Sequence, residues 1–122
     1  MPTIDQPLGG HPLRYRLGRD LSELIDEALL ARTGRSARTL VKEGPLRVTL
    51  IAIGAGGSIA PHHASGPITV HVLSGEILFR AGGDEWRLEP GDLLSLGPGV
   101  EHAVRSESGG VFLLTLAAAP EG

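Results

Sequence analysis

Four of the five histidines in this 122-residue chain are candidates for a common binding site. His62, His63 and His71 fall within ten positions, and His102 follows further along. Imidazole binds divalent first-row metals and changes its charge near neutral pH. The chain has no cysteine, so disulfides and thiolate-bound zinc are excluded. A metal site would therefore depend on which of these imidazoles point to the same place.

The direction of each histidine depends on strand geometry, because successive side chains of a strand point to opposite faces. Adjacent His62 and His63 cannot both face inward from a regular strand. Ile68 and its alternate neighbours are apolar, which predicts that His71 faces outward. A bulge at or before Gly66-Pro67 would reverse this parity. The sequence leaves open which of His63 and His71 faces the interior.

The elements that would position these residues are short strands. From about residue 38, apolar or alternating runs are separated by glycine and proline turns, which is typical of an all-β sandwich or barrel. We expect roughly eight strands, at residues 37–43, 46–53, 68–73, 76–82, 85–90, 92–98, 101–106 and 111–117. A further strand should follow the turn "GAGG" at 54–57.

One helix is predicted before the strands, in "DLSELIDEALLARTG". Asp20 is the expected N-cap, Glu23 completes a capping box, and Gly34 is the expected C-terminal stop. The first ~19 residues show no clean period and are interpreted as an extended arm. The expected organisation is thus an N-terminal arm and helix over 1–37 and a β-barrel over 38–122, in one structural domain.

Two glycine and histidine spacings resemble the sequence motifs of the cupin superfamily. The first runs Gly56, five residues, His62, one residue, Ala64, three residues, Ile68, six residues, Gly75. The second runs Gly91, seven residues, Gly99, two residues, His102. The resemblance implies a double-stranded β-helix, the jelly-roll barrel of the small RmlC-like cupins. The first motif is degenerate, because the family has a histidine where this chain has Ala64 and a glutamate where it has Ile68.

The resemblance further implies a site inside the barrel. In the family, two histidines of the first motif, its glutamate and the histidine of the second motif hold a divalent metal. In this chain His62 and His102 occupy such positions, and His71 or His63 could supply a third imidazole if it faced inward. A divalent transition metal, zinc, iron, manganese, nickel or copper, is the cofactor to expect. Glu101, next to His102, could orient its ring, although Glu101 and Glu76 are better read as surface or interface charges.

Three functions remain open on this evidence. A metal-binding cupin could act on a small organic molecule, a metal-free barrel could bind or sense a small ligand, and a structural module would bind neither. The fold itself hosts many activities and does not choose among them. None of the strand hydroxyls, Thr49, Thr69, Ser95 and Thr115, has a base at a known spacing, so serine-type catalysis is not supported, and no phosphate-binding loop is present. Whether the protein is an enzyme stays open.

Composition limits the partners. Residues 48–122 hold three basic and eight acidic side chains, and aromatic residues make up 3% of the chain, so nucleic acid is a poor candidate. No apolar run is long enough to span a membrane, and no secretory signal is evident. We therefore expect a cytoplasmic protein. An exposed sheet edge and the arm favour a homodimer, and the chemical partner would be an unidentified small molecule.

Overall fold

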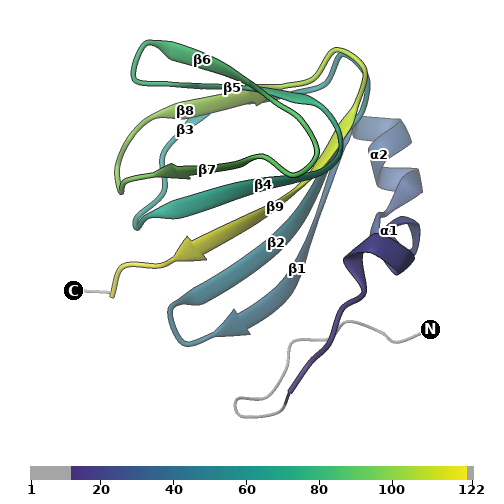
Figure 1. The fold of residues 1–122 in the computed structure, drawn as a ribbon, viewed down its shortest axis with the longest axis horizontal. Helices are drawn as coiled ribbons and strands as arrows, with labels where there is room; N and C mark the ends of the chain where they lie inside the picture. Colours follow the sequence, from purple (N-terminus) through teal and green to yellow (C-terminus); the bar gives the residue numbers. More distant parts are fainter. Residues whose placement is uncertain (1–11, 121–122) are drawn as a thin grey trace.

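Antiparallel strands make up most of the computed structural model, which describes residues 12–120 (Figure 1). Two short helices come first, α1 (Leu17–Leu24) and α2 (Glu27–Thr33). Nine strands follow within the described residues: β1 (Arg35–Glu43), β2 (Leu46–Ile53), β3 (Ser58–His62), β4 (Ile68–Gly75), β5 (Ile77–Ala81), β6 (Asp84–Leu88), β7 (Leu93–Leu96), β8 (His102–Arg105) and β9 (Gly110–Ala117).

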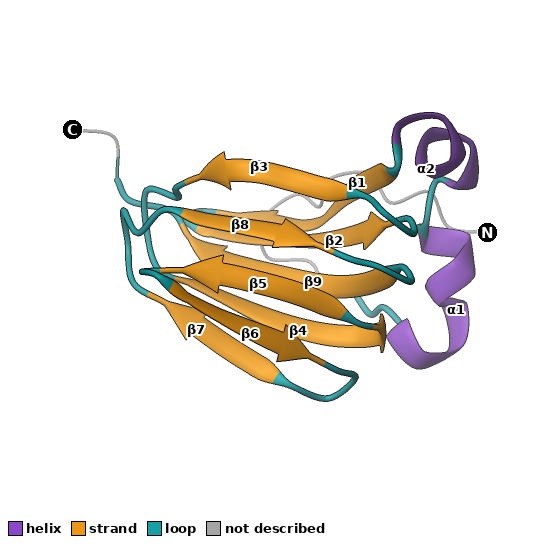
Figure 2. Ribbon diagram, turned by 90° about the horizontal axis from the view of Figure 1, so that it is seen from above, coloured by secondary structure: helices purple, strands orange, loops and turns teal. Residues whose placement is uncertain are grey.

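The strands form two facing sheets, as seen from above in Figure 2. One has the order β1-β2-β9-β4-β7 and the other the order β3-β8-β5-β6. Strands distant in sequence are neighbours in both sheets, and every pairing is antiparallel. This is the predicted jelly roll, and the all-β fold class is confirmed. The first strand begins at Arg35, before the expected start of the barrel at residue 38.

The core lies between the two sheets because each contributes its alternate residues to the interior. The burial of β4 shows the alternation clearly, with Ile68, Val70 and Val72 buried and the residues between them only partly so. Phe79 of β5 and Phe112 of β9 are the largest buried side chains. The other members of this cluster are Ile53, Ile77, Ala81, Leu88 and Val104.

The helical region differs from the prediction of one helix. It breaks at Ile25, which has an extended backbone, and a second helix then starts. Asp26 caps this helix by accepting a hydrogen bond from the backbone N–H of Leu29 at 2.9 Å. The predicted N-cap, Asp20, lies instead within α1 with a non-helical backbone. Gly34 does end α2, in the left-handed conformation expected of a C-cap.

The helices lie beside β1 and β2 (Figure 1), where a second, smaller cluster covers the outer face of the larger sheet. Leu24 of α1 is buried there with Leu40 and Leu50. Before the helix, the Tyr15 hydroxyl donates a hydrogen bond to the carbonyl of Leu40 at 2.5 Å. Neither helix is long and apolar enough to cross a membrane.

Candidate functional site

The contact between His62 and His102 is the centre of the candidate site. The two residues are directly opposite in the β3–β8 ladder, and their rings meet edge to face with centroids 4.2 Å apart. A register shift between Ile59 and His62 accounts for this geometry. Ile59 faces Val104, which is buried in the core, and one extra residue on β3 gives His62 the same side as His102. The bulge thus selects His62, and not His63, for the contact.

Both rings are oriented by the backbone in the same way. Nδ1 of His62 lies 3.0 Å from the carbonyl oxygen of Ala60, and Nδ1 of His102 lies 3.0 Å from that of Val100. A carbonyl oxygen can only accept, so Nδ1 must carry the proton in each ring. The lone pair of the neutral imidazole is then on Nε2. In each ring Nε2 is therefore the nitrogen that can accept a hydrogen bond from a ligand or bind a metal ion.

His102 is the deeper of the two histidines. It is 4% exposed and stacks on Phe79 with an interplanar angle of 12°. Burial lowers the pKa of His102 below its ordinary value, and nearby His62 and His63 lower it further, against the opposing effect of the Val100 carbonyl. His102 is consequently neutral at physiological pH.

The other candidate ligands lie elsewhere. His71 alternates with the buried Val70 and Val72, so it points to the outer face of the larger sheet, where it pairs with Leu93 and Leu113. His63 is exposed just after β3, near enough to His102 to affect its charge. Within residues 12–120, no group of three or more histidines or carboxylates is placed to hold a metal ion.

The two motif positions that lack the family's ligands carry apolar side chains. Ile68 is 3% exposed within the core cluster, and Ala64 packs against that cluster. Of the two glutamates considered in the sequence, Glu101 is exposed, and the His102 ring is held by the Val100 carbonyl instead. Glu76 forms an ion pair with Arg87. Within residues 12–120, the site thus brings two imidazoles together without the third histidine or carboxylate that a metal site would need.

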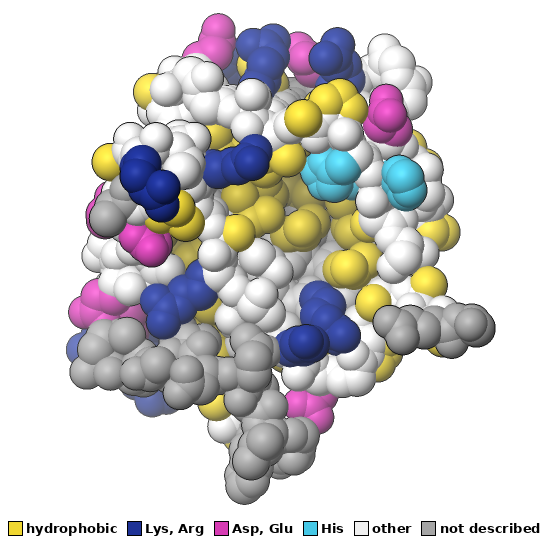
Figure 3. All heavy atoms as spheres, turned by 180° about the vertical axis from the view of Figure 1, so that it is seen from behind, with side chains coloured by type: hydrophobic (Ala, Val, Ile, Leu, Met, Phe, Trp, Pro, Cys, Tyr) yellow, Lys and Arg dark blue, Asp and Glu magenta, His cyan; other side chains and the backbone are white. Residues whose placement is uncertain are grey.

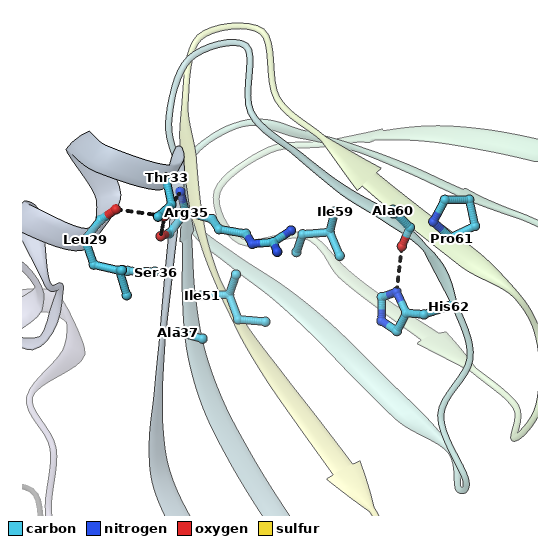
Figure 4. Close-up of a pocket in the computed structure, with 10 residues that line it drawn as sticks. All are labelled: Leu29, Thr33, Arg35, Ser36, Ala37, Ile51, Ile59, Ala60, Pro61 and His62. Carbon is cyan, nitrogen blue, oxygen red and sulfur yellow. Dashed lines mark hydrogen bonds between the residues drawn. The ribbon is translucent and has the colours of Figure 1, made fainter.

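A cleft of about 640 Å³ opens beside His62, between β1 of one sheet and β3 of the other. Figure 4 shows Ile51, Ile59 and Ala37 along it, with His62 at one side. Leu29 and Thr33 of α2 complete its end. In the space-filling view of Figure 3, apolar side chains form the floor of a hollow with basic and histidine side chains around it. The volume of the cleft is in the range of small-molecule sites.

Arg35 is the cleft residue that sequence reasoning missed. Its side chain extends from the start of β1 toward Ile59 (Figure 4), and its Nη1 lies 3.5 Å from the carbonyl of Ser58 on β3. Arg35 stands outside both sequence motifs and within the segment assigned to the arm and helix. Its place follows from the tertiary structure: β1 pairs with β2, which sets Arg35 opposite Ile53, and β1 and β3 are edge strands of the two sheets.

A close glycine junction fixes the end of the cleft. Gly34, after α2, accepts a hydrogen bond through its carbonyl from the N–H of Gly54 at 2.8 Å. A Cβ on Gly57 would lie 2.7 Å from that same carbonyl oxygen, closer than real Cβ atoms come. The turn before β3 can therefore approach the end of α2 only because residue 57 has no side chain.

A protein-family model described as "Cupin domain" matches residues 47–116. This chain is a cupin. The match contains both motifs and every strand from β3 to β8. No curated protein matches this cupin significantly.

Solved structures resemble this cupin over most of its length. A conserved protein of unknown function from Streptococcus pyogenes, SPY1581, aligns over 100% of this chain and 98% of its own with a TM-score of 0.71 and 23% identity. An RmlC-like cupin from Shewanella frigidimarina covers 73% of this cupin and 80% of its own chain (TM-score 0.67, 24% identity). A salicylate 1,2-dioxygenase from Pseudaminobacter salicylatoxidans covers 84% of this cupin with 34% of its own chain (TM-score 0.73, 19% identity). These TM-scores show a shared fold.

Proposed function

We propose that this cupin binds a small organic molecule in the cleft between β1 and β3. The observation that carries the proposal is the cleft itself, with an apolar floor and a few polar groups at its edge. Ile51 and Ile59 offer hydrocarbon contact, whereas His62 and Arg35 offer directed hydrogen bonds. Small-molecule sites commonly combine an apolar lining with a small number of placed polar groups.

The residues present do not fit a resident metal cofactor of the kind the family implies. Such a site uses three or four donors, whereas the described part of this chain brings together two imidazoles. The side chains at the remaining motif positions, Ala64 and Ile68, have no donor atom. The divalent metal predicted from the sequence stays a prediction, and metal-independent binding is the function that this donor set favours.

A thermal-shift screen of small organic molecules, carried out with the full-length protein treated with EDTA, tests the proposal. A ligand that binds the folded protein raises its melting temperature, because it stabilises the folded state by an amount that grows with the logarithm of one plus the ratio of free ligand concentration to Kd. We expect hits whose 1H–15N NMR perturbations centre on Ile51 and Ile59. Binding that appears only after a divalent metal is restored would contradict metal-independent function and support the metal prediction.

Two tryptophan variants localise the binding. Ala37→Trp places a large side chain in the cleft, and we expect it to abolish the response to every hit. Ala31→Trp is the matched control, because Ala31 is exposed on α2 and lies two residues from both Leu29 and Thr33, away from the helix face that lines the cleft. Retained binding in Ala37→Trp, or the absence of any hit for the wild type, would contradict the proposal.

A further inference from the structure

The charge on Arg35 has no counter-ion within the part of the chain that the structure describes. The two ion pairs there are Arg87–Glu76 and Arg105–Glu85, both on the smaller sheet or next to it. Arg35 makes one long side-chain contact, to the Ser58 carbonyl. A guanidinium group has five N–H donors in a planar fork, so most of its donors are left for another partner.

The cleft around this guanidinium is lined by apolar side chains, a few neutral polar ones and a histidine. None of the ten cleft-lining residues is acidic. The Arg35 side chain extends along the cleft toward Ile59, with Ile51 nearby and His62 further along (Figure 4). An anion in the cleft would therefore meet a positive group at one end and hydrocarbon beside it. A guanidinium binds a carboxylate through two parallel hydrogen bonds, which gives both orientation and affinity.

From this arrangement we propose that the cleft selects a small monocarboxylate with an apolar body, its carboxylate on the Arg35 guanidinium and its hydrocarbon against Ile51 and Ile59. This inference rests on the proposed function, since it names the ligand class of the same cleft. Charge complementarity carries it: a cation without a counter-ion beside an apolar floor matches an amphipathic anion. A neutral ligand of the same shape would leave the guanidinium without its charged partner.

Benzoate and benzamide are the probes that test this choice, because they share an aromatic ring and differ in charge. We expect NMR titrations of the full-length protein to show benzoate binding more tightly than benzamide, with perturbations at Arg35, Ile51 and Ile59. Added salt should weaken benzoate binding and leave benzamide unchanged, because an exposed ion pair is screened.

Variants on the two faces of β1 assign the effect to Arg35. Arg35→Gln should weaken benzoate binding by about tenfold or more with little effect on benzamide. Arg35→Lys keeps the positive charge but loses the planar pair of N–H donors, and it should give an intermediate affinity for benzoate. Arg38→Gln is the control: Arg38 pairs with Leu50, whose side chain belongs to the outer cluster, so Arg38 lies on the side of the strand away from the cleft. It should bind benzoate as the wild type does.

The outcomes separate this inference from the proposed function. If benzamide binds in the cleft as tightly as benzoate, or if Arg35→Gln leaves benzoate affinity unchanged, the carboxylate inference is wrong while small-molecule binding stands. If neither probe perturbs the cleft, although the screen finds other ligands there, the inference is wrong in the same way. If no compound of any class binds the cleft, both are wrong.

Discussion

His62 of β3 and His102 of β8 face each other across an antiparallel ladder, with ring centroids 4.2 Å apart and each Nδ1 held by the carbonyl two residues earlier. This shared geometry leaves the two Nε2 atoms as the chemically available nitrogens. It also makes the pair sensitive to protonation, since two imidazolium rings this close would repel one another.

The stability of the protein should fall as the pH falls below neutral, through His102. Its pKa in the folded state lies below the ordinary value of 6.5. The unfolded chain therefore binds more protons in the window between that lowered pKa and 6.5, and stability rises with pH across the window and is lost as pH falls through it. Urea unfolding at several pH values should show this slope in the wild type and a reduced slope in His102→Phe. An equal slope in the variant would contradict the assignment.

Restoring a donor should create metal affinity. Ala64→His places an imidazole at the position where the family's first motif has one, two residues after His62. Three imidazoles hold a divalent ion better than two, so calorimetric titration with Zn²⁺ should show tighter binding than in the wild type. The gain should disappear in Ala64→His/His102→Ala and persist in Ala64→His/His71→Ala, because His71 lies on the opposite face of β4. A gain that depends on His71 would contradict the placement of that residue.

Gly57→Ala should destabilise the fold at the closed end of the cleft. Its new methyl group would lie 2.7 Å from the Gly34 carbonyl oxygen and 2.8 Å from Cγ2 of Ile53. Neither can retreat freely, since one is backbone and the other belongs to a buried side chain, and overpacking of this kind costs about 1–3 kcal/mol. Chemical denaturation measures the change. Gly97→Ala is the control, because a Cβ there meets nothing within 4 Å, and a similar loss in that variant would refute the steric explanation.

The two aspartates near the helices should respond differently to substitution. Asp26→Ala removes the side chain that accepts from the Leu29 N–H and should cost about 1 kcal/mol. Asp26→Asn keeps an acceptor and should retain most of the stability. Asp20→Ala should change little, because Asp20 caps no helix in the structure. A larger loss from Asp20→Ala than from Asp26→Ala, measured by thermal or urea unfolding, would instead favour the single helix predicted from the sequence.

Much of the fold could be predicted from the sequence because its signals are local. Alternation of Ile68, Val70 and Val72 defines the inner face of β4 and sends His71 outward. The strand β3 was harder to delimit, since it contains Pro61 and most of its residues are exposed. The helix break at Ile25 could not be predicted either. The apolar spacing of Leu24 and the residues after it is helical, and it is the same for one continuous helix as for two helices with a break.

The sequence by itself determined the jelly-roll fold and the absence of donors at Ala64 and Ile68, and it limited the candidate histidines to His62, His63, His71 and His102. Tertiary structure decided which way the residues of β3 point, because a bulge exists only relative to a paired strand, and it was the ladder with β8 that gave His62 the side of His102. Tertiary structure also decided the cleft. Arg35 and His62 come from edge strands of different sheets, and no local pattern records that two such edges face each other.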